Sequence, residues 1–479
     1  MKIGMFSPFA TVAPHFEAEL ELLQQHIDAG DEVHYLHCDG KLANCDFNID
    51  READRCTDCL GRRQHGIEVL SGACRVSTID LQHTYPVPEF KSLPQLIDFE
   101  IDGFDVGYAT LSSLVSVCRD PEPDLVKYQS LLQRFMDAAL TTYQQTLDFI
   151  EQHQPDRVYV FNGRFAAMRA VLRACQKCGV DCFLHERGKN KDHYDLYPNH
   201  LPHDLDGVDA LIRKIWNEAD VSKRESVGAS WYQDRFDRVE TAWKSFTKDQ
   251  QYGSLPEGFS DSQRNISIFT SSDDEFVAIG DGWRNTLYPE QVQAIAKIAS
   301  DMLEASPQTR LYVRAHPNLK DVDNARKRSM LALDFPNLTV IGPETDIDTY
   351  ALVKASDIVV SFGSSVGMEA VYWGRPSVLL GPCLYQSLGG PIRSESHEHT
   401  IELLCGEHAA ADKTGALMYG HWFQARGFPY RYFQATDFFE GKFKGEVLYN
   451  RGANPPRKRK RWKSMLPRVL RGSSGKSSG

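Results

Sequence analysis

Residues 355–381 read ASDIVVSFGSSVGMEAVYWGRPSVLLG. A short apolar run, a Gly/Ser turn, a helical segment that ends in a glycine and a second apolar run follow one another, which predicts the order strand, turn, helix, strand. Strands separated by helices of this length form parallel sheets with right-handed crossovers. The stretch therefore predicts an α/β fold built on a parallel sheet.

The same alternation extends over most of the 479 residues, too long a chain for a single core. We predict two Rossmann-like, doubly wound domains at 1–261 and 262–450, the first with a helical insertion near 90–153, followed by a tail at 451–479. In the second domain the pattern predicts strands at 264–270, 310–317 and 338–342 and a helix at 289–306; in the first it predicts strands at 2–6, 32–38, 156–163 and 180–188 and helices at 17–30 and 164–179.

The composition is that of a water-soluble globular chain, with 42% hydrophobic and 25% charged residues. No stretch approaches the roughly 18 to 20 apolar residues that a membrane span needs. Pro8 and Pro14 interrupt the first apolar run, so no secretory signal is expected and a cytoplasmic location is predicted. The net charge is −11 although the segment from Arg457 onward holds nine Lys and Arg and no acid. The body before it is therefore strongly acidic, which argues against a nucleic-acid partner.

Polar residues at strand ends of the second domain are the first functional signal. Ligands of doubly wound sheets bind outside the carboxyl ends of the strands. Arg314 and His316 stand at such an end, where a cation can neutralise a diphosphate and an imidazole can protonate a leaving phosphate. An arginine in an ion pair and a histidine packed under a loop are the alternative interpretation.

The turn within 355–381 predicts a second phosphate contact. Gly363 permits a tight turn, and Ser364 and Ser365 bring backbone N–H groups to a helix N-terminus, which attracts phosphate. Glu369, one turn into the helix, is expected to accept hydrogen bonds from ribose hydroxyls. The alternative is an ordinary helix cap with a solvated glutamate. A GxxxxGK[ST] loop is absent.

Taken together, AHPN at 315–318 and the pattern SD-IVVS-GSSVGMEA-YWGRP-VLL at 356–380 resemble the donor-binding half of GT-B glycosyltransferases of bacterial surface polysaccharides. The most similar group comprises capsule-synthesis proteins, sialyl- and Kdo-transferases and CDP-glycerol glycerophosphotransferases. The resemblance implies two Rossmann-like domains that face each other across a cleft. It also implies that His316 contacts the donor phosphate and acts as leaving-group acid, and that Ser364 and Ser365 hold phosphate. Ser271 and Ser272, after the first strand of the domain, are further candidates for a phosphate-facing loop.

In this fold the first domain holds the acceptor and, in inverting members, a general base whose pKa must lie near the working pH. Glu186 follows the apolar run VDCFL at 180–184 of a predicted strand, and His15 follows the first strand of the chain. We rank Glu186 before His15 as the base. Asn162, Arg164 and Arg187 are expected to face the acceptor or the cleft. For each of them a structural role is the alternative.

Two features concern metals. Cys38, Cys45, Cys56 and Cys59 fall within one short region, and four thiolates that include a C-x2-C half-site suit a structural zinc ion; small buried cysteines are the alternative. No DxD-type pair stands in a context that suggests a catalytic divalent ion, because Asp273-Asp274-Glu275 follows a strand of the donor domain. Catalysis is therefore expected to require no metal or other cofactor.

The tail reads RKRKRWKSMLPRVLR at 457–471 and combines cations with Trp462 and aliphatic residues. This pattern is typical of a peripheral segment on an anionic membrane, the alternative being a solvated tail.

The combined prediction is a metal-independent glycosyltransferase that moves a sugar from a UDP-, CMP- or CDP-activated donor to a growing surface polysaccharide or a lipid-linked acceptor, as in capsule, O-antigen or exopolysaccharide biosynthesis. A glycerol- or ribitol-phosphate transferase and a nucleotide-sugar 2-epimerase share the two-domain plan and remain alternatives. The non-enzymatic alternative is a polysaccharide-assembly binding protein.

Overall fold

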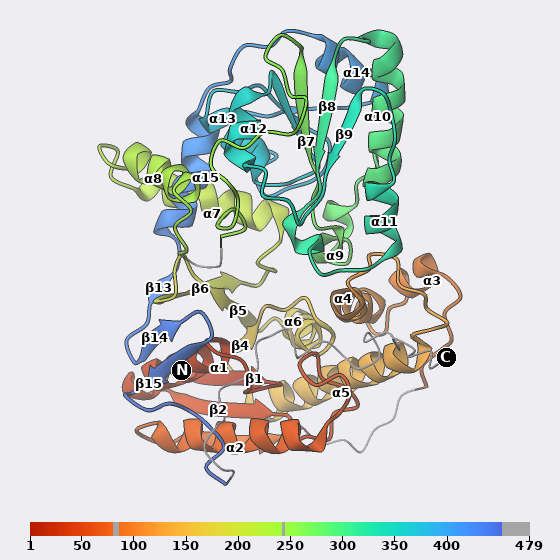
Figure 1. The fold of residues 1–479 in the computed structure, drawn as a ribbon. Coiled ribbons are helices and arrows are strands. Elements are labelled where there is room, and N and C mark those ends of the chain that lie inside the picture. Colours follow the sequence, from red (N-terminus) through yellow and green to blue (C-terminus); the bar gives the residue numbers. More distant parts are fainter. Residues whose placement is uncertain (80–85, 242–244, 453–479) are drawn as a thin grey trace, which may run out of the picture. The chain divides into compact units, whose positions relative to one another are not determined.

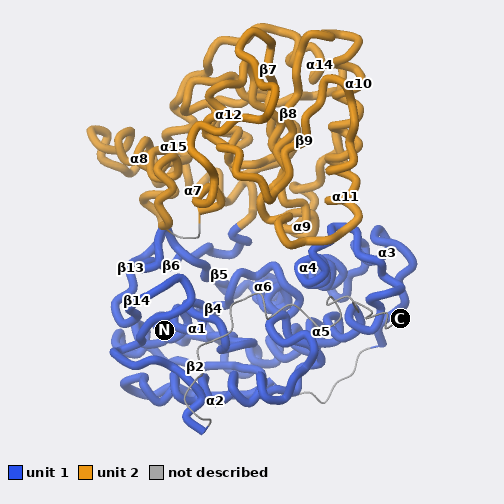
Figure 2. The backbone as a smooth tube through the Cα atoms, viewed as in Figure 1, with its two compact units in different colours: residues 1–202, 427–479 blue, residues 203–426 orange. Residues whose placement is uncertain are grey.

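The computed structural model describes residues 1–79, 86–241 and 245–452, and the chain forms two compact units (Figures 1 and 2). Unit 1 comprises Met1–Pro202 together with the chain from Gly427 onward, and unit 2 comprises His203–Arg426. Each unit contains its own sheet, largely parallel in unit 1 and entirely parallel in unit 2, with helices beside it. The predicted α/β architecture of two Rossmann-like units is confirmed.

The sheet of unit 1 has the strand order β13-β6-β5-β4-β1-β2-β3. The pairs from β5 through β4, β1 and β2 to β3 are parallel, whereas β6 is antiparallel to both of its neighbours, β5 and β13. The central strand β1 pairs with both β2 and β4, so that Met5 lies opposite Tyr35 on one side and Tyr159 on the other. The strands are β1 (Lys2–Ser7), β2 (Glu32–His37), β3 (Arg75–Thr78), β4 (Arg157–Phe161), β5 (Asp181–Arg187), β6 (His193–Pro198) and β13 (Phe428–Pro429).

The helices of unit 1 are α1 (His15–Asp28), α2 (Ala53–Val69), α3 (Leu93–Ile97), α4 (Val106–Cys118), α5 (Gln129–His153) and α6 (Ala166–Cys178). Helix α1 buries both an apolar and an acidic set of side chains against the sheet. Its Glu21 carboxylate accepts the backbone N–H groups of Arg431, Tyr432 and Phe433. These bonds hold the segment leading to the hairpin of β14 (Phe433–Asp437) and β15 (Glu440–Phe443) on unit 1.

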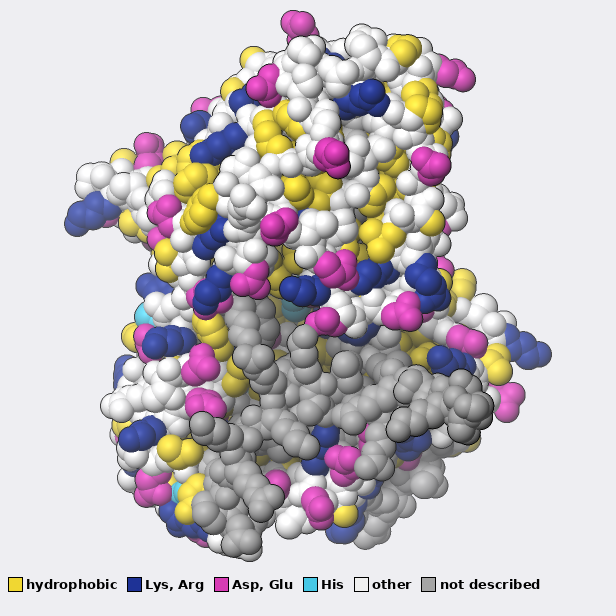
Figure 3. All heavy atoms as spheres, in the orientation of Figure 1, with side chains coloured by type: hydrophobic (Ala, Val, Ile, Leu, Met, Phe, Trp, Pro, Cys, Tyr) yellow, Lys and Arg dark blue, Asp and Glu magenta, His cyan; other side chains and the backbone are white. Residues whose placement is uncertain are grey.

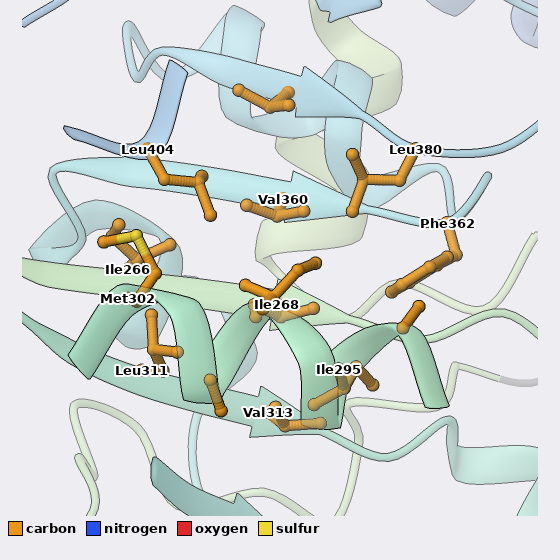
Figure 4. Close-up of a cluster of buried hydrophobic side chains, with 14 of the residues drawn as sticks. Ile266, Ile268, Ile295, Met302, Leu311, Val313, Val360, Phe362, Leu380 and Leu404 are labelled. Atoms are coloured by element: carbon orange, nitrogen blue, oxygen red, sulfur yellow. The ribbon is translucent and has the colours of Figure 1, made fainter. Parts of the chain in front are cut away.

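The sheet of unit 2 has the order β12-β11-β10-β7-β8-β9, and all its strand pairs are parallel. Apolar residues at alternate positions of β7 and β8, among them Ile268 and Val313, pack with Ile295 and Met302 of α10 (Figure 4). The strands are β7 (Asn265–Phe269), β8 (Arg310–Arg314), β9 (Leu338–Ile341), β10 (Ile358–Ser361), β11 (Ser377–Leu379) and β12 (Ile392–Arg393).

Helices connect the successive strands of this sheet from β7 to β11. The α-helices of unit 2 are α7 (Leu205–Glu218), α8 (Arg224–Phe236), α9 (Asp273–Phe276), α10 (Gln291–Ala305), α11 (Ala325–Leu331), α12 (Thr349–Ala355), α13 (Val366–Tyr372), α14 (His397–Cys405) and α15 (Thr414–Ala425), with 3₁₀ turns η1 (Asp281–Trp283) and η2 (Pro317–Leu319).

The predicted boundaries at 262 and 450 are wrong, because the units divide after Pro202 and again after Arg426. Helices α7 and α8 belong to unit 2. Helix α8 lies so close to α15 that a Cβ on Gly228 would stand 2.3 Å from the carbonyl oxygen of Leu417, and the Tyr232 hydroxyl donates to the Ala416 carbonyl at 2.7 Å. The chain then returns to unit 1, where β13 pairs with β6. Contacts between such distant segments leave no local signal in the sequence.

Charged side chains of both signs are interspersed on the face drawn in Figure 3. Among the described helices, none combines the length and the apolar character that crossing a membrane requires. The predicted membrane-associating segment at 457–471 lies outside the described residues.

Candidate functional site

The strand order of unit 2 reverses between β7 and β10, because β8 and β9 lie on one side of β7 while β10, β11 and β12 lie on the other. In open α/β sheets, ligands bind outside the carboxyl ends of the strands at such a switch point. The segments that follow the carboxyl ends of β7 and β10 begin at Thr270 and Phe362. The structure therefore places the predicted residues 271–272 and 363–365 at the edge where a ligand is expected.

Three features fix the conformation of the turn after β10. Phe362 is buried in the core of unit 2 (Figure 4). Gly363 has a φ of +117°, and a Cβ there would stand 2.6 Å from the carbonyl oxygen of Pro382, so this position requires glycine. The Tyr385 hydroxyl donates to the Ser364 carbonyl. The predicted tight turn is thus present and preorganised, whereas phosphate binding by Ser364 and Ser365 stays a prediction.

Glu369 does not lie on a solvated face. Its side chain is 1% exposed, and its carboxylate accepts hydrogen bonds from Arg235 at 3.0 Å, Ser365 at 2.9 Å and Tyr350 at 2.7 Å. Burial alone would raise the pKa of Glu369, but Arg235 and the two hydroxyls hold it below its ordinary value. The alternative of a solvated glutamate is therefore wrong, and the carboxylate ties α13 to α8 and α12; its predicted contact with ribose stays a prediction.

His316 lies where β8 ends, beside the segment that follows β7. Its backbone N–H donates to the Thr270 hydroxyl at 2.9 Å, and its Nδ1 accepts the backbone N–H of Asn318 at 3.2 Å. Because Nδ1 acts as an acceptor, the neutral ring carries its proton on Nε2. The side chain thus has the tautomer that a donor to a phosphate oxygen needs.

Arg314, the last residue of β8, is 3% exposed. Its guanidinium donates to the hydroxyl and, at 3.3 Å, to the carbonyl of Thr345, both of which are neutral oxygens. Burial lowers the pKa of Arg314 to about 10, against the opposing effect of Asp346. Even so it is protonated at neutral pH, so a buried positive charge bonded to neutral oxygens lies at the end of β8.

Ser271 and Ser272 lie in an acidic segment. Their hydroxyls donate to Asp273 at 3.4 Å and to Asp274 at 2.7 Å. Asp273 also pairs with Arg326 at 2.8 Å, and burial raises its pKa. These carboxylates would repel an anion at the same point. Phosphate binding by the two serine hydroxyls stays a prediction, and it would require the hydroxyls to turn away from the carboxylates.

In unit 1 the predicted residues also gather at a switch point, between β1 and β4. Asn162, directly after β4, donates through Nδ2 to Glu186 Oε2 at 2.7 Å, and the Arg187 backbone N–H donates to Glu186 Oε1 at 2.9 Å. His15 begins α1, and its ring centroid lies 4.1 Å from that of Phe161. Asn162, Glu186 and His15 thus lie at one edge of the sheet of unit 1, while their roles at an acceptor stay predictions.

The electrostatics of this edge affect His15 most. Burial, with additional repulsion from Arg187 and His185, lowers the pKa of His15 well below its ordinary value of 6.5. The ring is therefore neutral at physiological pH and able to accept a proton. Arg187 donates to the carbonyls of Phe438 at 2.7 Å and Ala13 at 3.2 Å, so it joins the β1–α1 loop to the C-terminal hairpin. Arg164 lies over the ring of Phe165, 4.6 Å from its centroid.

Sequence reasoning missed the supporting groups: Arg235 and Tyr350 around Glu369, Tyr385 under the Ser364 turn, and Thr270 beside His316. Their sequence separations, 134 residues in the case of Arg235 and Glu369, explain why no local pattern marks them.

Residues 247–400, about a third of the chain, match the model of a family described as capsule polysaccharide biosynthesis protein. No curated protein shows a significant match. Among solved structures the chain is similar to the β-Kdo 2,4-transferase KpsC of Thermosulfurimonas dismutans, with 13% identity, a TM-score of 0.38 and coverage of 56% of this chain and 79% of that one. It is also similar to the UDP-GlcNAc 2-epimerase of Methanocaldococcus jannaschii, with 10% identity, a TM-score of 0.31 and coverage of 87% and 97%.

The matched segment begins before β7 and ends within α14, so it contains Ser271, His316 and Gly363. The predicted resemblance is thereby confirmed: over residues 247–400 this chain is similar to the capsule polysaccharide biosynthesis proteins.

Proposed function

We propose that this protein is a glycosyltransferase of capsule polysaccharide biosynthesis that uses a nucleotide-activated sugar. One observation carries the proposal: the switch point of the unit 2 sheet, where an α/β sheet binds its ligand, lies inside the segment that matches the capsule family. His316, Arg314 and the Gly363 turn all belong to this edge.

The chemistry of donor cleavage suits these groups. Negative charge develops on the phosphate oxygen of the leaving nucleotide as the glycosidic bond breaks, and a preorganised donor aimed at that oxygen stabilises it. His316 would donate from Nε2 because its Nδ1 is engaged by Asn318. Arg314 adds a buried positive charge close by in the sequence, and the turn at Ser364 supplies backbone N–H groups.

The acceptor hydroxyl would lose its proton to a base of unit 1. Glu186 is held by Asn162 and by the backbone of Arg187, which fixes the direction of its carboxylate. His15 is the second candidate because it is neutral. The acceptor is proposed to be a saccharide or a lipid-linked saccharide, and the reaction is proposed to require no divalent ion.

The decisive experiment is a thermal-shift screen of UDP, CMP, CDP, GDP and TDP and their common sugars against the wild-type chain, His316→Ala and His408→Ala. A ligand at about 100 times its dissociation constant adds roughly 2.7 kcal/mol of stability. We expect one nucleotide class to stabilise the wild type and the His408 variant, and His316→Ala to lose most of the effect. His408 is a matched control because it follows α14, which ends at the opposite edge of the sheet. This position is fixed by Arg264, just before β7, which donates to the Leu404 carbonyl near the end of α14.

Absence of any shift in the wild type would reject the donor site. A shift that persists in His316→Ala would leave a nucleotide site but remove His316 from it. An epimerase would interconvert the nucleotide sugar without an acceptor, so product analysis with donor alone separates that activity from transfer.

The basic segment at 457–471 is proposed, from its sequence alone, to bring the enzyme to an anionic membrane. Co-sedimentation with vesicles rich in anionic lipid should fall strongly when residues 453–479 are deleted, and it should fall for the full chain when salt is raised. Equal binding by the full chain and the truncated chain would refute the role of the tail.

A further inference from the structure

Four cysteines of unit 1 line a single pocket. Cys38 directly follows β2, Cys45 lies in the segment that leads to α2, and Cys56 and Cys59 lie in the first half of α2. Their i, i+3 spacing puts the last two on one face of the helix. The rest of the pocket wall is largely apolar and includes Phe9, Leu42, Phe47 and Leu60. All eleven cysteines of the chain are free thiols.

Three of these sulfurs accept an N–H group. The backbone N–H of Gly40 donates to Cys38 at 3.2 Å, the side-chain amide of Asn48 donates to Cys56 at 3.2 Å, and the backbone N–H of Ala10 donates to Cys59 at 3.1 Å. A thiol sulfur is a weak acceptor, whereas a thiolate accepts such bonds strongly because it is charged. Such donors would support these three sulfurs as metal ligands, since the thiolate is the form that binds metal.

Three arginines lie at or beside the same pocket. Arg51 and Arg55 contribute to its wall, and the guanidinium of Arg63 lies 3.8 Å from the sulfur of Cys59. Four thiolates around a divalent ion carry a net charge of minus two, which is costly to bury without compensation. Arg51 and Arg63, which donate to backbone carbonyls beside the cluster, would offset this charge, whereas Arg55 is already paired with Glu52.

The donor set selects the ion. Four thiolates with no oxygen ligand are characteristic of structural zinc, which is tetrahedral and leaves no open position. As the chain lies in this structure, no three His, Cys, Asp or Glu side chains among the described residues are arranged to hold a metal ion. Binding must therefore draw the sulfurs together. The segment 39–52, which carries Cys45, forms no helix or strand.

We propose that Cys38, Cys45, Cys56 and Cys59 bind one zinc ion that fixes the β1–α1 loop in front of His15. The connection is direct: Cys59 holds the backbone of Ala10, and the Phe9 ring packs edge-on against Phe161, 5.6 Å away. Phe161 in turn packs against the His15 ring. Zinc would thus stabilise unit 1 at the edge where His15 and Glu186 gather, and it would take no part in any chemical step.

The test measures metal content, independently of enzymatic activity. The full chain, purified under reducing conditions from zinc-supplemented cells, should contain one zinc per chain by elemental analysis. Cys56→Ser and Cys59→Ser should lose nearly all of it, whereas Cys405→Ser, an exposed cysteine of unit 2, should keep it. Cobalt exchanged into the wild type should show an intense thiolate charge-transfer band and the visible bands of a tetrahedral ion.

The cobalt spectrum protects the test against a serine variant that fails to fold, because it needs only the wild-type chain. A wild type without bound metal, stoichiometric zinc in both serine variants, or a cobalt spectrum without thiolate bands would overturn the proposal. Stoichiometric iron and sulfide in place of zinc would likewise overturn it.

Discussion

Replacing Glu369 by Gln distinguishes a structural role of this residue from a role as a ribose ligand. The substitution keeps the shape of the side chain but removes the charge that accepts bonds from Arg235, Ser365 and Tyr350. Loss of one partner of a buried ion pair costs about 3–5 kcal/mol. The Arg235 side chain is 39% exposed, so water can solvate part of its charge, and we expect a loss of about 2 kcal/mol instead. For a unit of this size that corresponds to a fall in melting temperature of about 4–8 °C.

A graded series checks this magnitude. Tyr350→Phe removes only one of the three bonds and should cost about 1 kcal/mol. Glu402→Gln, an exposed glutamate on α14, should change stability by no more than about 0.5 kcal/mol. Amide hydrogen exchange of peptides that cover 362–373 should quicken in the first two variants and not in the third, because Glu369 ties α13 to its neighbours.

The pH dependence has a definite sign. The folded pKa of Glu369 lies below its ordinary value of 4.5, so its contribution to stability is complete above that pH and is lost as the pH falls through the folded pKa. The stability difference between wild type and Glu369→Gln should therefore be constant near neutrality and shrink in acid. A variant that melts like the wild type but no longer responds to nucleotide would refute the structural role and support Glu369 as a ribose ligand.

Two further substitutions test the two sheet edges. If Glu186 is the base, Glu186→Gln should lower kcat by about 100-fold or more and leave nucleotide-induced stabilisation intact. If His15→Gln instead causes the loss and abolishes the acid limb of the pH–rate profile below 6.5, the base is His15. Gly363→Ala should destabilise unit 2 by about 1–3 kcal/mol and weaken nucleotide binding, because its Cβ would collide with the Pro382 carbonyl. Gly374→Ala is the control, since it also has a positive φ, of +76°, but nothing lies within 4 Å of the added Cβ. An equal effect of both changes on nucleotide binding would refute the role of the Gly363 turn.

The local elements of this protein could be read from its sequence. The apolar run 358–361 followed by Gly363 and a helix is a pattern of adjacent residues, and adjacent residues determine strands, tight turns and helix starts. Because parallel strands present their carboxyl ends at one edge, the sequence also indicated that His316 and Gly363 lie along the same edge of a sheet. The same reasoning brought Asn162 and Glu186 together at the edge of the unit 1 sheet.

Only the tertiary structure decided the limits of the two units and the partners of the buried groups. Residues 427–452 follow unit 2 in the chain but belong to unit 1, because Glu21 supplies acceptors for backbone N–H groups there. Arg235 likewise meets Glu369 across 134 residues. A buried charge needs a partner of opposite charge, but in the folded chain that partner can come from any position in the sequence. Local sequence therefore determined which elements form, and the packing of distant segments determined what each buried polar group contacts.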